Sequence, residues 1–214
     1  MRQMVDEKLT VLEVTRRLPE VMKIEDADLR DEVINALRHT PDYFWTVPAS
    51  SSKKYHNPWC RNEHGLWIHV KMAFTTLDRI SYTYVEQGLL PAEWIDYAKA
   101  AVLLHDMFKQ GFPDERAERS EKHTVPDHDV IGAEWLEAYT DLPEPVIDAV
   151  HEHNGGWGEG SAPVDHDCRG RQFHLSMLVH TADMMASDPN TTAGLYRPAK
   201  EIAEKYPNIP RAAL

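Results

Sequence analysis

Residues 100–109 read Ala-Ala-Val-Leu-Leu-His-Asp-Met-Phe-Lys, an apolar helical run that ends abruptly in His105 and Asp106. Burial of an ionised carboxylate in such a run is costly unless a cation compensates its charge. Imidazole and carboxylate side chains together suit a divalent metal ion, which would supply that positive charge. A helix cap formed by the same pair is the alternative for this dipeptide taken alone. The stretch therefore predicts a buried helix with a candidate metal site at its end.

Metal-type ligands also occur in two other apolar helical stretches. His69 lies near the start of one of them and Asp183 lies near the end of another. Helical bundles build metal sites from side chains that several helices direct inwards. We therefore expect His69, His105, Asp106 and Asp183 to hold one divalent ion, with positions left open for water.

A second metal ion would need further ligands and a carboxylate that bridges the two ions. His128 lies at the start of one expected helix, whereas His151 and His153 lie at the end of another. His128 as a simple helix cap is the alternative. Of His151 and His153, one is expected to be a ligand and the other to support it or to be exposed, and the sequence does not choose between them. The second site is therefore less strongly indicated than the first.

Nearly every segment between turns has helical periodicity, and no strand-like alternation or hairpin turn competes with it. The predicted fold class is therefore all-α. Asp26 is a suitable N-cap, Gly88 and Gly111 are suitable stop signals, and Pro91 suits a first helical turn. Helices are expected at about 5–22, 26–37, 65–86, 91–109, 127–136, 146–153, 172–186 and 199–206, with loops over 41–63, 112–124 and 157–170.

The length of 214 residues suits one domain with a closed core. We expect a single domain over 1–214, made of an N-terminal helical arm (1–40), a core (41–187) and a C-terminal helical tail (188–214). The formal net charge of −12 disfavours a protein that coats long nucleic acid, because non-specific binding depends on neutralising phosphates.

The sequence contains no apolar run of the roughly 18 residues that a membrane-spanning helix needs, and residues 1–8 lack the apolar core of a signal peptide. Cys60 and Cys168 lie far apart and form no Cys-x-x-Cys pair. A disulfide framework is therefore not expected, and the predicted location is the cytoplasm.

The ordered set of His69, His105-Asp106 and Asp183, with Lys109 three residues after Asp106, resembles the HD-domain phosphohydrolase superfamily over residues 41–187. Three local stretches are similar to the entry segment of the HD domain in YhaM-type 3′–5′ exoribonucleases; they are Phe44-Trp45-Thr46-Val47-Pro48-Ala49-Ser50, Tyr55-His56 and Gly65-Leu66-Trp67-Ile68-His69. The resemblance implies an HD-domain helical bundle with a metal site between core helices.

Two departures accompany this resemblance. Many two-metal members carry a His-His pair, which appears here as the split His151 and His153 or as His153-Asn154. The YhaM-type enzymes also carry a separate oligonucleotide-binding domain, for which this chain has no strands. The second metal site and a polymeric substrate are therefore the weaker implications.

The resemblance implies hydrolysis of a phosphoester by metal-activated water, with Mn, Mg, Fe, Ni or Co as the divalent metal. Asp106 would ligate and, in a two-metal centre, bridge. Lys109, one helical turn further on, would stabilise negative charge on the phosphoryl group, unless it is a solvated lysine at a helix end. His56 would contact phosphate or donate a proton, with simple loop packing as the alternative.

The substrate is the least determined part of the prediction. Lys53, Lys54 and Arg61 make the entry loop basic, beside Tyr55 and Trp59 as candidate base-stacking surfaces. A nucleotide or a short single-stranded oligonucleotide is expected, and long duplex is not. A 3′–5′ exonuclease acting on single strands and a non-catalytic HD module that binds metal or nucleotide are the alternatives. The sequence leaves an oligomer open.

Overall fold

The computed structural model describes residues 9–51, 56–119, 123–155 and 170–189 of the chain. All regular secondary structure in these ranges is helical, which confirms the predicted all-α class. In chain order the elements are α1 (Val11–Arg17), η1 (Pro19–Lys23), α2 (Ala27–Leu37), η2 (Asp42–Trp45), η3 (Pro58–Cys60), α3 (Gly65–Glu86), η4 (Ala92–Trp94), α4 (Ile95–Leu104), α5 (Pro113–Glu118), α6 (His128–Tyr139), α7 (Glu144–His151) and α8 (Arg171–Ser187).

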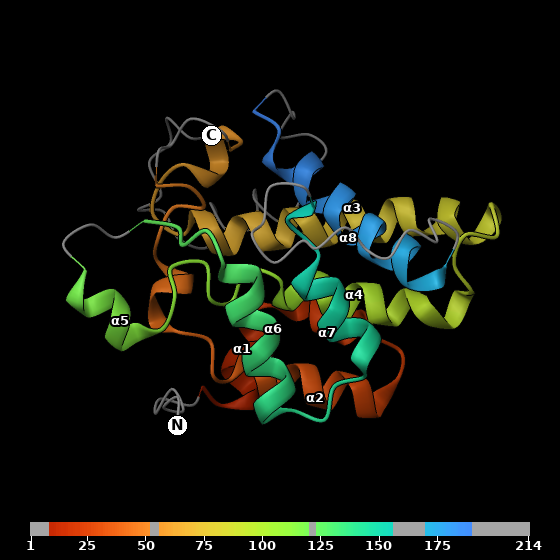
Figure 1. Ribbon diagram of the computed structural model, residues 1–214, viewed down its shortest axis with the longest axis horizontal. Coiled ribbons are helices and arrows are strands. Elements are labelled where there is room, and N and C mark those ends of the chain that lie inside the picture. Colours follow the sequence, from red (N-terminus) through yellow and green to blue (C-terminus); the bar gives the residue numbers. More distant parts are fainter. Residues whose placement is uncertain (1–8, 52–55, 120–122, 156–169, 190–214) are drawn as a thin grey trace.

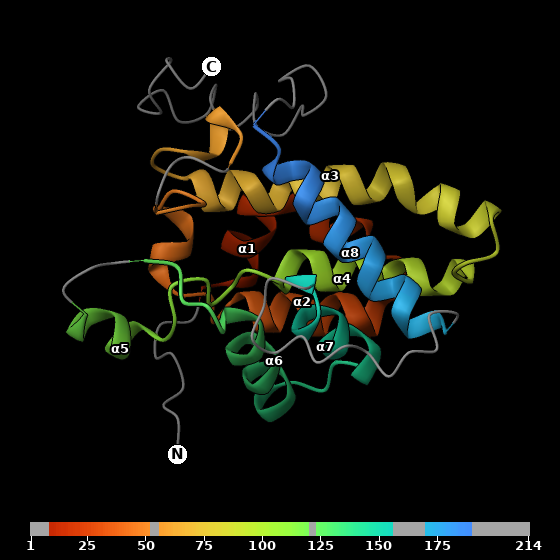
Figure 2. The same cartoon turned by 45° about the horizontal axis from the view of Figure 1, so that its top comes forward.

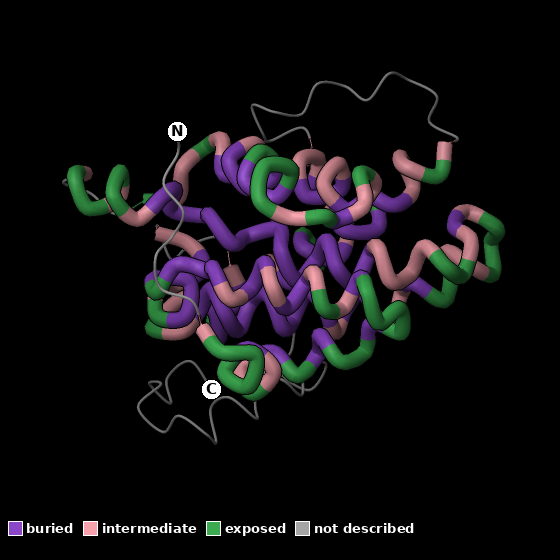
Figure 3. Tube along the Cα trace, turned by 90° about the horizontal axis from the view of Figure 1, so that it is seen from below, coloured by how far each residue is buried: buried purple, intermediate pink, exposed green. Residues whose placement is uncertain are grey.

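Helices α3 and α4 form the centre of the bundle. Helix α8 packs against both of them and crosses over them in Figures 1 and 2. Helix α4 also contacts α2 and α7, and α6 packs against α7. Helix α5 projects from the body of the molecule (Figure 2). Buried positions line the inward sides of these helices (Figure 3), and their apolar side chains form one core cluster that runs from Val14 to Ala186.

The start of α3 requires a glycine. His64, which precedes the helix, has a φ of 65°, and its Nδ1 contacts the Trp45 carbonyl oxygen. A Cβ atom on Gly65 would overlap the Cys60 carbonyl oxygen and lie 3.0 Å from the Ala49 amide nitrogen. The loop over 41–63 therefore packs directly on the helix backbone, and this close packing fixes the entry to α3.

The helix expected at 91–109 was predicted too long. Pro91 precedes η4, and α4 then ends at Leu104. Beyond it the amides of Met107, Lys109 and Gly111 donate to carbonyls three residues earlier, which is the tighter turn pattern. His105 and Asp106 consequently lie in a turn that follows α4 and not inside the helix.

Other expected elements also differ from the structure. The first helix is split because Pro19 starts the short η1 after α1, and a proline cannot continue a helix interior. The loop expected over 112–124 contains α5, which opens with Pro113 in its first turn. Helix α7 begins at Glu144 and ends at His151, two residues before the expected end. The helix expected at 199–206 lies outside the described residues.

The first elements pack onto the core through apolar and charged contacts. Lys71 of α3 pairs with Glu20 of η1 at 2.5 Å, and both side chains are buried. Lys23 pairs with Asp78 at 2.6 Å. No helix within the described ranges is long and apolar enough to cross a membrane.

Candidate metal centre

Six polar side chains from five parts of the fold meet in one buried place. His69 comes from α3, His105 and Asp106 from the turn after α4, His128 from the first residue of α6, His153 from the turn after α7, and Asp183 from α8. Each of these six residues is at most 7% exposed as a whole. Buried polar groups at this density need compensating partners, because each has lost its contacts with water.

The first group of ligand-type atoms forms around His69. Its Nε2 lies 2.9 Å from Asp183 Oδ1, 3.5 Å from Asp106 Oδ2 and 3.4 Å from His105 Nε2. His105 Nε2 lies 3.4 Å from Asp106 Oδ2 and 3.7 Å from Asp183 Oδ1. His69, His105 and Asp106 lie close enough together to hold one ion, and Asp183 Oδ1 lies beside the two histidine nitrogens.

The second group forms around the other oxygen of Asp106. His128 Nε2 lies 3.2 Å from Asp106 Oδ1, and His153 Nε2 lies 3.6 Å from the same atom. The Asp106 carboxylate therefore faces both groups, with Oδ2 towards the first and Oδ1 towards the second. This is the arrangement that a carboxylate bridging two cations would have.

Backbone carbonyls orient three of the four imidazole rings. The Nδ1 atoms of His105, His128 and His153 lie 2.8, 2.8 and 2.6 Å from the carbonyl oxygens of Val102, Val125 and Val150, each three residues earlier. A carbonyl can only accept, so Nδ1 carries a proton in each ring, and Nε2 is the nitrogen that faces the cluster. His153 Nε2 has no hydrogen-bond partner. The donor set fits a divalent metal ion.

The electrostatics of the cluster point the same way. Burial raises the pKa of Asp106, but Lys109 and His105 outweigh it and hold that pKa well below its usual range. Burial also raises the pKa of Asp183, and here His105 and His69 outweigh it. Burial lowers the pKa of His105, yet Asp106 and Asp183 raise it to about 10. The two carboxylates thus favour added positive charge, which a divalent ion would supply.

Lys109 lies on the shared carboxylate. Its Nζ donates to Asp106 Oδ1 at 3.0 Å and to Oδ2 at 2.8 Å, and its side chain is only 10% exposed. Burial lowers the pKa of Lys109, but Asp106 and Asp183 outweigh it and raise that pKa above its ordinary value. The interpretation of Lys109 as a solvated lysine at a helix end is therefore wrong.

The loop histidine His56 lies beside the first group. Its ring centroid is 5.1 Å from that of His69, with the rings edge to face, and both of its ring nitrogens are buried without a hydrogen-bond partner. Burial first, and then His69 and Lys109, lower the pKa of His56 to about 3, so the ring is neutral. Arg61 Nε donates to the His56 carbonyl at 2.6 Å, which fixes the loop at this point.

The structure separates the remaining predicted site residues. His153 enters the second group, whereas His151 is half-buried at the end of α7 and belongs to neither group. The expectation that His151 is a ligand is therefore not supported by the geometry. Lys53 and Lys54 lie outside the described residues. Trp59 is buried in the core, so its predicted role as a base-stacking surface is wrong.

Sequence reasoning missed several residues that support the cluster. The Tyr43 hydroxyl donates to the Gly111 carbonyl at 2.8 Å and accepts from the Gln110 amide at 3.2 Å, so it clamps the turn that bears Asp106. His180 Nδ1 lies 2.7 Å from the His153 carbonyl oxygen. Because these contacts join residues that lie far apart in the sequence, no local sequence pattern predicts them. Asp129 is a third residue that was not predicted. It is fully buried beside His128, and a charged side chain at a buried position is the signal that marks it.

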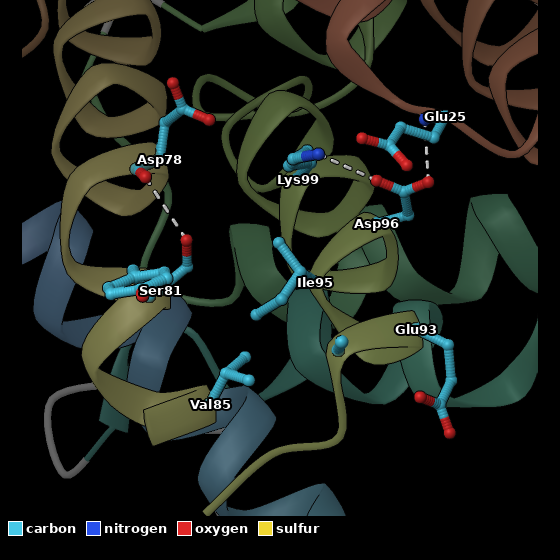
Figure 4. A pocket seen from close by; sticks show the side chains of 10 residues that line it. Glu25, Asp78, Ser81, Val85, Glu93, Ile95, Asp96 and Lys99 are labelled. Atoms are coloured by element: carbon cyan, nitrogen blue, oxygen red, sulfur yellow. Dashed lines mark hydrogen bonds and ion pairs between the residues drawn. The ribbon is translucent and has the colours of Figure 1, made fainter. Parts of the chain in front are cut away.

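A surface pocket of about 510 Å³ lies at the other end of α3 and α4 (Figure 4). Two of its carboxylates are paired, Asp78 with Lys23 and Asp96 with Lys99. Asp96 lies nine residues before His105, and eight residues of α-helical rise already span about 12 Å. The pocket is therefore separate from the candidate metal centre.

The comparisons with known proteins bear on this geometry. A family model described as the HD domain matches residues 81–192, more than half of the chain. The matched stretch contains His105, Asp106, His128, His153 and Asp183, and His69 precedes it. No curated protein and no solved structure matches the chain. With its helical bundle and its buried histidine–aspartate cluster, the chain belongs to the HD domain family, whose members are generally metal-dependent hydrolases.

Proposed function

We propose that this protein is a metal-dependent phosphohydrolase that cleaves a phosphoester of a nucleotide or short oligonucleotide. The observation that carries the proposal is the Asp106 carboxylate, which presents one oxygen to each of two histidine groups. Family membership supports the hydrolytic chemistry. No other group of buried polar side chains among the described residues offers such an arrangement.

Two sets of residues would hold the ions. His69, His105, Asp106 and Asp183 would hold one, and Asp106, His128 and His153 would hold the other. Divalent ions in such sites lower the pKa of water and neutralise charge on phosphoryl oxygens. The first set has two carboxylates and the second has one, so we expect the first to bind more tightly. Nitrogen and oxygen donors without thiolate suit Mn, Mg, Fe, Ni or Co.

Two further residues would act on the substrate directly. The Lys109 ammonium would stabilise negative charge that develops on the phosphoryl oxygens. The neutral His56 ring has two unpartnered nitrogens beside the first group, so it would hydrogen-bond a phosphoryl oxygen. Proton donation to the leaving oxygen, the other role expected of His56, would need the imidazolium form, which a pKa of about 3 disfavours. Both side chains lie at the cluster without being needed to complete either group.

The nucleotide part of the proposal rests on the entry loop. From the resemblance of the sequence stretches 44–50, 55–56 and 65–69 to the entry segment of YhaM-type exoribonucleases, we infer a substrate built from nucleotides. Lys53, Lys54 and Arg61 are the proposed phosphate contacts of this loop. The net charge of −12 favours a small substrate over long polymers, because little of the surface attracts phosphates at a distance.

The test is elemental analysis followed by a hydrolysis screen with added Mn²⁺, Mg²⁺, Ni²⁺ or Co²⁺. The panel contains bis(p-nitrophenyl) phosphate, nucleoside mono- and triphosphates, cyclic nucleotides, and short RNA and DNA. We expect turnover of at least one nucleotide substrate and its loss in Asp106→Ala. Bound metal without turnover of any compound would instead indicate a non-catalytic binding module. Activity that survives Asp106→Ala would contradict the proposed site.

A further inference from the structure

Asp129 is a buried carboxylate that is not part of the candidate metal centre. It is fully buried in the first turn of α6. Its Oδ1 accepts a hydrogen bond from the Val130 amide at 2.9 Å, whereas its Oδ2 has no hydrogen-bond partner. A helix N-terminus favours a carboxylate, but it does not require burial or an unpaired oxygen. An unpaired oxygen on a buried carboxylate is costly, and a cation within reach would remove that cost.

Lys109 is a buried cation on a turn that the backbone joins to the start of α6, where Asp129 lies. The Val125 amide donates to the Lys109 carbonyl at 3.0 Å, and the His128 amide donates to the Val125 carbonyl at 3.4 Å. These bonds attach the turn of Lys109 to the start of α6. Asp129 adds to the negative charge that acts on the Lys109 ammonium. Asp129 itself belongs to neither ligand group.

The present position of the Lys109 ammonium conflicts with cation binding. It occupies both oxygens of Asp106, at 2.8 and 3.0 Å, and these are the oxygens that the two ions would share. Like charges a few ångströms apart in a buried site repel strongly. Binding of an ion at Asp106 therefore displaces the ammonium, which must find another acceptor or leave the interior.

We propose that Asp129 is a positioning residue that receives the Lys109 ammonium when a divalent ion occupies Asp106. The inference rests on the proposed metal centre. Without metal, the ammonium neutralises Asp106 and leaves Asp129 Oδ2 free; with metal, the ammonium moves to Asp129 and remains charged beside the site. Asp129 thereby lowers the cost of exchanging one cation for another, and it keeps Lys109 in place for the substrate.

The experiment is a double-mutant cycle on metal affinity, which needs no turnover. Metal-free wild type, Asp129→Asn, Lys109→Met and the double variant are titrated with Mn²⁺ in a calorimeter. Asp129→Asn is expected to weaken binding at least tenfold when Lys109 is present. In the Met background the same change is expected to weaken binding less than threefold, because no ammonium needs a second acceptor. Asp96→Asn changes a carboxylate that lines the surface pocket at the other end of α3 and α4. It is the matched control and is expected to leave the affinity for Mn²⁺ unchanged.

Two other results of the titrations would contradict the inference. An equal weakening in both backgrounds would mean that Asp129 acts on the ion by charge alone, and no weakening would mean a purely structural role. If Asp129→Asn does not fold, Lys109→Met remains decisive, because weaker binding than wild type would contradict displacement of the ammonium. Absence of Mn²⁺ binding to the wild type would also overturn it. A cycle that behaves as expected without hydrolysis of any substrate would leave the inference standing and remove the proposed function.

Discussion

His151 and His153 are two residues apart, yet the structure gives them different environments. The His153 ring is fully buried, with its Nδ1 on the Val150 carbonyl and its Nε2 at Asp106. His151 ends α7 and stays half-buried away from the cluster. The sequence could not choose between them, because both follow the same apolar run and the choice depends on where the helix ends. Gly155, with a φ of 55°, closes the turn that carries His153 inwards.

This difference predicts unequal effects of two alanine substitutions. His153→Ala is expected to reduce bound metal by one ion per chain, because the second group retains only Asp106 and His128. His151→Ala is the matched control and is expected to leave the metal content unchanged. Elemental analysis after equilibration with Mn²⁺ measures both. A loss of metal in His151→Ala that equals the loss in His153→Ala would contradict the assignment of the second group.

Lys109 predicts a metal-dependent change in stability. In the metal-free protein, Lys109→Met removes the ammonium that neutralises buried Asp106, which is expected to cost about 3–5 kcal/mol of unfolding free energy. Saturating Mn²⁺ is expected to restore most of the loss, because the ion replaces the missing charge. Urea unfolding with and without Mn²⁺ measures the difference. A loss that Mn²⁺ does not reduce would show that charge compensation is not the cause.

At the scale of elements, helices with strong local signals were predicted well. Helix α3 has the predicted bounds of 65–86, and α8 extends one residue beyond each predicted end. Their apolar periodicity and the Gly88 stop signal are local properties, so the sequence displays them. The end of α4 was wrong because long-range contacts shape it: the Tyr43 hydroxyl binds the following turn from a segment more than 60 residues away. The ligand residues could therefore be predicted from the sequence, whereas the turns that orient their side chains could not.

Two glycines provide a matched test of the loop-to-helix contact at α3. Gly65→Ala is expected to destabilise the fold by about 3 kcal/mol or more, because the added carbon overlaps the Cys60 backbone. Gly132→Ala in α6 meets only Val150 Cγ1 at 3.6 Å, so it is expected to be neutral or to stabilise by up to about 1 kcal/mol. Thermal unfolding of both variants measures this. Equal stability of the two would contradict the close packing at Gly65.

At the scale of the whole molecule, hydrogen bonds join the segment between η1 and α2 to the core, beside the surface pocket at the other end of α3 and α4. Asp96 at the start of α4 accepts hydrogen bonds from the Glu25 and Asp26 amides at 2.7 and 2.9 Å, and it pairs with Lys99 at 2.8 Å. Lys99 Nζ also donates to the Lys23 carbonyl at 2.7 Å. One carboxylate therefore links the segment between η1 and α2 to the bundle.

This link predicts a pH-dependent stability. Burial raises the pKa of Asp96, but Lys99 and the Asp26 and Glu25 amides outweigh it, so the folded-state pKa lies below the ordinary value of 3.8. The stabilisation is therefore present above pH 3.8 and is lost as the pH falls through the folded-state pKa. Asp96→Asn is expected to be less stable than wild type near neutral pH, with the difference shrinking in acid. Urea unfolding across this range checks it, and a gap that widens in acid would contradict the assignment.

The main-chain acceptors behind His105, His128 and His153 have a consequence for how the site can fail. Each ring is oriented by a carbonyl of its own segment, three residues back. No substitution removes a backbone carbonyl, so point mutations outside the ligands leave this orientation in place. An insertion or deletion within these three-residue spacings would rotate the ring off its acceptor while preserving every ligand. The orientation of these three rings is therefore insensitive to changes of residue type and sensitive to changes of register.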